Sequence, residues 1–328
     1  MKKLLTRLSL VTAISLCVAT SAMAQVTIKF AHAAPDSDLQ QNLAVFFKEK
    51  VEKDTNGAVK VQIFPQGQLG NDAQMIDGAR SGIIDIVMVG LNNFSGLMPE
   101  SEAFGLPFMF PAREQAYKAL DGKAGQSVLN SMETHGLKGL GFPENGYRNM
   151  TNKRGPIRTP ADLKGLRMRV NNSKALNDMF AAMGANPQQL PIAELYTALE
   201  TGVVDSQDHP IGVTLSFKYY EVQKFLSLTQ HAYSPLAVAM NLKKFNSLTA
   251  AQKKVVLDAA KQSVDMQRKL SISKENEMIA ALEKNGMKVN RDVNGAAFQA
   301  ATKPIWDTFI AKNGDKLINE IRAISAAK

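Results

Sequence analysis

Residues 26–63 read VTIKFAHAAPDSDLQQNLAVFFKEKVEKDTNGAVKVQI, and this stretch decides the fold class. Apolar and polar residues alternate over 26–30, which predicts a β-strand with one buried face. Apolar residues at helical spacing follow between 39 and 51, and Asn56-Gly57 ends that helix. A second alternating run over 59–63 completes a strand–helix–strand unit. The sequence therefore predicts an α/β protein.

A short internal sequence repeat suggests that this unit occurs twice. A short helix is predicted up to Arg80, with Asn71 or Asp72 as its cap, and Gly82-Ile-Ile-Asp85 follows it. A second short helix is followed by Gly202-Val-Val-Asp205, which matches by residue type. The length of 328 residues also fits about two domains. We therefore expect two related lobes.

The second lobe is predicted to follow a crossover between Gly139 and Pro160, where Gly, Pro, Asn and Arg accumulate. Its strand over 167–170 runs into Asn171-Asn-Ser173, which opens a helix that Gly184 closes. A long helix is predicted over 249–285, which contains neither Gly nor Pro until Gly286. At about 55 Å it would brace more than one lobe, although two helices joined near 271–273 would also fit.

The first 24 residues have the form of a secretory signal. Basic residues precede the apolar stretch 8–18, and Ala22-Met-Ala24 supplies the cleavage site. The single Cys of the chain, Cys17, lies inside this signal, so the expected mature protein from Gln25 has no disulfide. No later stretch approaches the apolar length of a membrane span. We expect export to the bacterial periplasm.

Motifs for catalysis, cofactors and metals are missing from the sequence. No Ser lies in a G-x-S-x-G motif, and Gly122-Lys123 is followed by Ala124 where a phosphate loop requires Ser or Thr. Asp205, Asp208 and His209 lie close together but lack a second His at ligand spacing. The net charge of +9 is scattered without a dense basic block, which disfavours nucleic acid. We expect no catalytic residue, no cofactor and no metal.

Arg169 is the most informative single residue. It ends a strand immediately before a capped helix, where ligands bind in α/β folds and a guanidinium can grip a carboxylate. A structural Arg paired with an acid would occupy the same position. Arg148, in the crossover, is a second candidate, and His32, at the end of the first strand, could line a site or be a polar loop residue.

Six ordered blocks of sequence resemble the DctP-type solute-binding proteins of TRAP transporters. They are Asn145-Gly-Tyr-Arg148, Thr159-Pro-Ala-Asp-Leu-Lys-Gly-Leu-Arg-Met-Arg169, Gly184-Ala-Asn-Pro187, Glu194-Leu-Tyr-Thr-Ala-Leu-Glu200, Val204-Asp-Ser-Gln-Asp-His-Pro210 and Tyr220-Glu-Val-Gln-Lys-Phe225. The resemblance extends over essentially the whole mature chain. It implies a periplasmic receptor with two α/β lobes, a ligand cleft between them and a long helix that spans both. Such a receptor closes on an organic acid and delivers it to the TRAP membrane permease subunits.

The resemblance also implies the arrangement of the chain. The signal peptide occupies 1–24, lobe I comprises 25–147 and 235–274, and lobe II comprises 148–234 and 275–303. A C-terminal helix over 304–328 packs on the lobes. We expect a monomer.

The ligand-binding residues follow from the resemblance position by position. Arg169 matches the Arg that pairs with the ligand carboxylate, Arg148 matches the Arg that supports it, and His209 falls at a contact position that is often Asn before Pro in the family. Asn93 and Asp72 match first-lobe positions that face the cleft in relatives, where they could hydrogen-bond sugar hydroxyl groups. The set of expected ligand-binding residues is completed by Asn172 and His32.

The ligand class is expected to be a six-carbon sugar acid, either a keto-gulonate or a hexuronate. Asp208-His-Pro210 and His231-Ala-Tyr-Ser-Pro235 look most like the subgroup that includes the 2,3-diketogulonate receptor, whereas Gly90 stands where sialate binders have Glu. Two other functions stay open. One is a periplasmic lyase or isomerase using His209 with Asp208 as acid and base, and the other is a ligand sensor for a signalling receptor.

Overall fold

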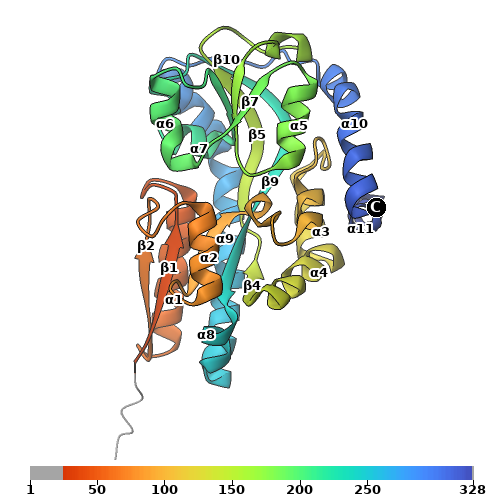
Figure 1. Ribbon diagram of the computed structural model, residues 1–328. Helices are drawn as coiled ribbons and strands as arrows, with labels where there is room; N and C mark the ends of the chain where they lie inside the picture. Colours follow the sequence, from red (N-terminus) through yellow and green to blue (C-terminus); the bar gives the residue numbers. More distant parts are fainter. Residues whose placement is uncertain (1–24, 327–328) are drawn as a thin grey trace, which may run out of the picture.

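The computed structural model describes residues 25–326, so the predicted signal peptide over 1–24 lies outside the described residues. Two β-α-β-α-β units form its framework (Figure 1). The first unit comprises β1 (Val26–His32), α1 (Leu39–Asp54), β2 (Val59–Phe64), α2 (Asp72–Ser81) and β3 (Ile86–Gly90). The second comprises β6 (Arg167–Val170), α5 (Lys174–Ala182), β7 (Asn186–Gln189), α6 (Ile192–Glu200) and β8 (Ser206–His209). In each unit the first strand lies between the other two and is parallel to both.

The short repeat, over residues 82–85 and 202–205, lies at equivalent positions in these two units. Gly82 and Gly202 both have positive φ, at 89° and 77°, as a left-handed turn after a helix requires. Asp85 accepts the backbone N–H of Lys29 on β1, and Asp205 accepts that of Arg167 on β6. The repeat predicted from four residues is therefore present in the backbone and in its hydrogen bonds.

One long strand joins the two units into a mixed sheet. The strand order is β2-β1-β3-β9-β5-β8-β6-β7, and β9 (Phe225–Asn241) also pairs with β4 (Leu137–Gly141) and β10 (Lys288–Asn290). The C-terminal part of β9 pairs with β3 and β4, whereas its N-terminal part pairs with β5 (Glu144–Asn152) and β10. We call the strands on the C-terminal part of β9, with their helices, the first lobe, and those on its N-terminal part the second lobe. They lie at the bottom and top of Figure 1.

The remaining helices complete the lobes and connect them. They are η1 (Leu91–Phe94), η2 (Pro99–Gly105), α3 (Arg113–Asp121), α4 (Lys123–Ser131), η3 (Met132–His135), η4 (Pro160–Leu163), α7 (Ile211–Ser216), η5 (Tyr219–Glu221), α8 (Leu242–Ser247), α9 (Ala250–Lys284), α10 (Gly295–Asn313) and α11 (Lys316–Ala326).

The long helix α9 is continuous through residues 271–273, as the first of the two interpretations predicts. Thr249 and Gln252 form the expected capping box at its start. The helix packs on α1 and β4 in the first lobe and on α7 and β10 in the second. It therefore spans both lobes, at a length of about 50 Å.

The C-terminal part differs from the single helix expected over 304–328. Helix α10 already begins at Gly295 and contains Pro304, and α11 follows it. Helix α10 packs on α5 of the second lobe, and α11 packs on α3 and α4 of the first lobe, so the two helices run along the side of both lobes (Figure 1). Within residues 25–326, no helix is long and apolar enough to cross a membrane.

Candidate ligand-binding site

A polar cavity lies between the two lobes. Its walls come from the ends of the central strands of both units, as expected for an α/β fold. The first lobe contributes Ala33, Ala34, Gln40, Asp72, Met88, Val89, Gly90, Asn92, Asn93 and Leu236, and the second contributes Asn145, Arg148, Arg169, Asn171, Ile192, His209, Val213, Phe217 and Ser234. Of the seven residues expected to bind ligand, five line this cavity: Arg169, Arg148, His209, Asp72 and Asn93.

Arg169 supplies the positive charge of the cavity. It is 2% exposed, and its Nε and Nη2 donate to the carbonyl oxygen of Leu190 at 2.9 and 2.7 Å. Its Nη1 donates to Nε2 of His209 at 3.2 Å. Burial lowers the pKa of this guanidinium, which nevertheless keeps its proton. No carboxylate of the described residues forms an ion pair with it, so donors and charge are available to an anion.

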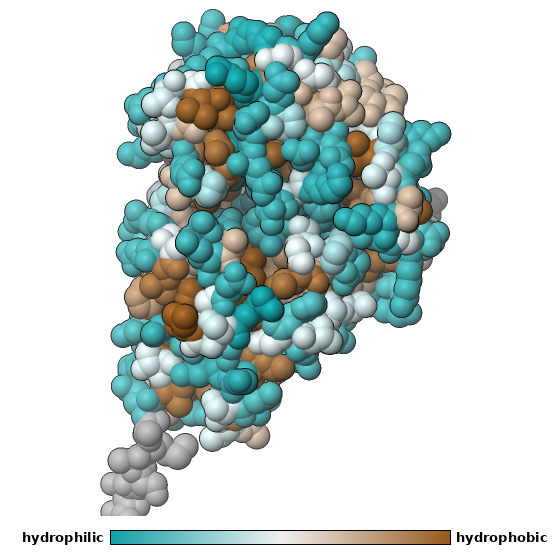
Figure 2. Space-filling model, in the orientation of Figure 1, coloured by the Kyte–Doolittle hydropathy of each residue, from teal (hydrophilic) through white to brown (hydrophobic). Residues whose placement is uncertain are grey.

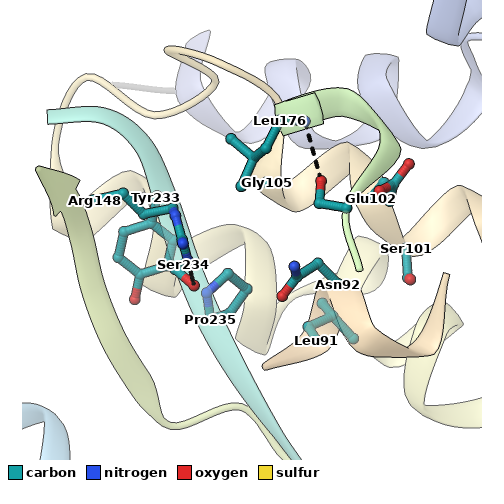
Figure 3. Close-up of a pocket in the computed structure, with 11 residues that line it drawn as sticks. Leu91, Asn92, Ser101, Glu102, Gly105, Arg148, Leu176, Tyr233, Ser234 and Pro235 are labelled. Atoms are coloured by element: carbon teal, nitrogen blue, oxygen red, sulfur yellow. Dashed lines mark hydrogen bonds between the residues drawn. The ribbon is translucent and has the colours of Figure 1, made fainter. Parts of the chain in front are cut away.

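Arg148 is already paired within the protein. Its Nε and Nη2 donate to the two carboxylate oxygens of Asp208 at 2.6 and 2.9 Å. Nε2 of His231 lies 3.1 Å from the same carboxylate, and Arg148 holds the pKa of Asp208 well below its usual range. Its Nη1 points to the hydroxyl of Ser234 at 3.4 Å (Figure 3). An anion in the cavity is therefore left to Arg169, because the charge of Arg148 is balanced by Asp208.

His209 is a neutral neighbour of Arg169. Its Nδ1 lies 2.5 Å from Oε1 of Gln207, and its ring is 4% exposed. Burial, with Arg169 and Arg148 nearby, lowers the pKa of His209 well below its usual value. The imidazole therefore accepts from Arg169 without adding a second positive charge.

Asp72 and Asn93 form the facing wall in the first lobe. Nδ2 of Asn93 donates to Oδ2 of Asp72 at 3.0 Å. Burial raises the pKa of Asp72, and the charge of Arg169 acts in the opposite direction. Together they present hydrogen-bonding groups opposite Arg169.

The other two expected residues lie elsewhere. Asn172 lines a neighbouring pocket that shares Arg169 and Asp72 with the cavity, and its Oδ1 accepts from Nε2 of Gln189 at 2.7 Å. His32 does not line the cavity: it is fully buried, its Nε2 lies 2.9 Å from Oε1 of Gln41, and its pKa is lowered by burial. The cavity is lined instead by Ala33 and Ala34, which directly follow β1.

Among the cavity residues that were not predicted from the sequence, two have unpaired buried polar atoms. Oδ1 of Asn171 and Nδ2 of Asn92 are buried and have no hydrogen-bond partner among the described residues. Asn171 directly follows β6 and Asn92 lies in η1 just after β3, two residues after Arg169 and Gly90 respectively. Their position just after the end of a strand is the sequence feature that could have predicted them. Unpaired buried polar atoms favour a polar ligand in this cavity.

Side chains hold the lobes together across the cleft. Oγ of Ser95 donates to the carbonyl oxygen of Asn172 at 3.1 Å, and Oγ of Ser216 donates to Oδ2 of Asp38 at 2.6 Å. Glu102 lies beside the start of α5 in a second, smaller space that shares Arg148 with the main cavity (Figure 3). In the space-filling view, the two lobes touch over much of the face turned to the viewer (Figure 2). The structure therefore shows the lobes closed.

This geometry agrees with the comparison to known families. The sequence model for "Bacterial extracellular solute-binding protein, family 7" (DctP) matches residues 30–313. The chain belongs to this family. The resemblance stated from the sequence is thereby confirmed, as is the two-lobed α/β architecture of the family.

Three relatives within the DctP family are informative. The 2,3-diketo-L-gulonate-binding periplasmic protein YiaO of Escherichia coli is 42% identical over 89% of this chain and 89% of its own. The C4-dicarboxylate-binding periplasmic protein DctP of Rhodobacter capsulatus is 32% identical over 96% of each chain. The crystal structure of a sugar acid binding protein from Advenella mimigardefordensis in complex with galactonate has a TM-score of 0.89 and 33% identity, covering 92% of this chain and 98% of that one.

Proposed function

We propose that this protein is the periplasmic receptor of a TRAP transporter and captures a six-carbon sugar acid, such as a keto-gulonate or a hexuronate. The observation that carries the proposal is Arg169, a buried cation that lines the cavity with no carboxylate partner among the described residues. A ligand carboxylate supplies the missing charge, and Arg binds carboxylates through paired N–H donors.

The rest of the cavity suits a polyhydroxylated chain. Asp72 and Asn93 from the first lobe, with Asn171, Asn145 and Ser234 from the second, offer donors and acceptors to hydroxyl groups. YiaO binds 2,3-diketo-L-gulonate and the Advenella protein binds galactonate, which supports the same class here. Asp72 disfavours a second ligand carboxylate, as in a C4 dicarboxylate.

Closure of the lobes links ligand binding to transport. A ligand held by Arg169 in one lobe and Asp72 in the other stabilises the closed state. The closed protein presents one combined surface to the TRAP membrane permease. We expect this receptor to act as a monomer after cleavage of its signal peptide.

The geometry disfavours the lyase or isomerase. His209 already binds Arg169 and Gln207, and Asp208 already binds Arg148 and His231. Neither group is free to exchange a proton with a substrate.

A thermal-shift screen tests the proposal. Refolded protein from Gln25 onward is screened with hexuronates, aldonates, 2,3-diketo-L-gulonate and succinate, because a ligand of the native state raises the melting temperature. Titration calorimetry of the best ligand should show that Arg169→Ala weakens binding by about tenfold to 100-fold. Arg167→Ala is the matched control, since Arg167 lies on the same strand but is exposed and paired with Asp205. Equal affinity of the Arg169→Ala variant and the wild type would contradict the proposal.

A further inference from the structure

Four buried side chains form a hydrogen-bonded chain that ends at Arg169. Thr151 on β5, Gln207 and His209 on β8 and Gln223 before β9 are each 0 to 4% exposed. Oγ1 of Thr151 lies 3.0 Å from Oε1 of Gln223 and 2.9 Å from Nε2 of Gln207. Gln207 then contacts His209, which contacts Arg169.

The direction of every bond in this chain follows from chemistry. Arg169 has only donors, so Nε2 of His209 must be the acceptor and carries no proton. The imidazole proton is then on Nδ1 and is donated to Oε1 of Gln207. Nε2 of Gln207 donates to Thr151, whose hydroxyl donates to Gln223. The amide of Gln223 donates to the backbone carbonyl oxygen of Val222 at 2.9 Å, which anchors the chain.

We propose that Gln207 is a positioning residue that keeps His209 neutral with its proton on Nδ1, and thereby orients Arg169 toward the ligand carboxylate. The inference rests on the proposed function insofar as Arg169 binds the ligand.

The charges around His209 explain why a neutral partner is needed. Arg169 on β6 and Arg148 on β5 are cations, whereas the neighbouring carboxylate of Asp208 on β8 is committed to Arg148 and His231. The ring of Tyr219 on η5 lies 5.9 Å away, and Asp72 on α2 faces Arg169 across the cavity. A protonated His209 would lose its acceptor for Arg169 and place a second cation 3.2 Å from it.

A glutamine at position 207 serves this purpose where a glutamate would not. The amide oxygen orients the Nδ1–H group without adding the negative charge that stabilises an imidazolium ion. Gln207→Glu keeps the size of the side chain but introduces that negative charge next to His209. The variant therefore separates an electrostatic role of Gln207 from a packing role.

Nitrogen-15 NMR of the histidine-labelled, ligand-free protein is the first test, because the two neutral tautomers and the imidazolium ion have different ring-nitrogen shifts. His209→Asn identifies the signal. The wild type should show the Nδ1–H tautomer of His209 from pH 8 to pH 5.5, and Gln207→Glu should show the imidazolium ion within that range. An Nε2–H tautomer in the wild type, or an unchanged neutral ring in Gln207→Glu, would overturn the inference.

Affinity supplies the second readout, with galactonate and 2,3-diketo-L-gulonate as probes. Gln207→Glu should bind about tenfold more weakly than the wild type at pH 6, with a smaller loss at pH 8. Gln230→Glu, an exposed position on β9, is the charge-matched control and should bind like the wild type. If Gln207→Glu does not fold, Thr151→Val takes its place in the test. This variant removes the hydroxyl that anchors Gln207 and should allow the Nε2–H tautomer of His209. A correct tautomer without binding of any sugar acid would contradict the proposed function but not the role of Gln207.

Discussion

Glu102 of the first lobe caps a helix of the second lobe: its Oε1 accepts the backbone N–H of Lys174, the first residue of α5, at 2.8 Å. The same helix has Ser173 as its own cap. A carboxylate at a helix N-terminus is stabilising, and this one is in place only when the lobes are closed. We therefore expect ligand affinity to depend on a contact outside the main cavity.

We predict that Glu102→Ala weakens ligand binding without altering the preferred ligand. Loss of a cap costs about 1 kcal/mol, which corresponds to roughly a fivefold loss of affinity if the contact exists only in the closed state. Titration calorimetry measures the loss, and small-angle scattering should show a larger open fraction. Glu100→Ala, on the same 3-10 helix, is the control. Wild-type affinity in Glu102→Ala would show that closure does not use this cap.

Asp208→Asn should strongly destabilise the fold. Arg148 is 2% exposed, so removing the charge of Asp208 leaves a buried cation unpaired, at a cost of about 3–5 kcal/mol. Chemical denaturation at pH 7 measures the change. Asp258→Asn removes an exposed partner of Lys254 and should cost less than about 0.5 kcal/mol. Equal costs for the two variants would mean that the Arg148 pair is not buried in solution.

Buried neutral histidines should make stability depend on pH. The pKa values of His32, His209 and His231 are lowered by burial, so the unfolded chain takes up protons first and stability falls as pH drops below about 6.5. Each of these groups contributes a slope of up to about 1.4 kcal/mol per pH unit. His32→Gln leaves the cavity unchanged. Between pH 7 and pH 5, the free energy of unfolding of this variant should fall less steeply than that of the wild type, by up to about 1.4 kcal/mol per pH unit. An unchanged slope would contradict the prediction.

Asp72→Asn should change which acids bind. The wild type is expected to prefer sugar monoacids to succinate, because Asp72 faces Arg169 and repels a second carboxylate. Removing this charge should narrow the ratio of the two affinities by about tenfold. Competition titrations of galactonate against succinate give the ratio. If the ratio stays constant in Asp72→Asn, the charge of Asp72 does not select the ligand.

Features formed by consecutive residues could be predicted from the sequence, whereas contacts between residues far apart in the chain could not. Arg169 was identifiable because its strand, turn and capped helix are consecutive, and the short repeat located both units. The pairing of Arg148 with Asp208 joins residues 60 positions apart, which no local pattern indicates. His32 satisfied the same strand-end rule as Arg169, but the orientation of its side chain depends on where β1 ends, and helix and strand limits are the least certain part of any such prediction.

The shared strand β9 has a consequence for how the protein unfolds. Its 17 residues carry ladder hydrogen bonds of both lobes, and one apolar cluster includes Phe104 of η2 together with Phe180 of α5. Cutting the chain between the lobes would leave unpaired strand edges and an open core on each fragment. Neither lobe should therefore be obtainable as an independent domain, and calorimetry of the whole protein should show a single cooperative melting transition.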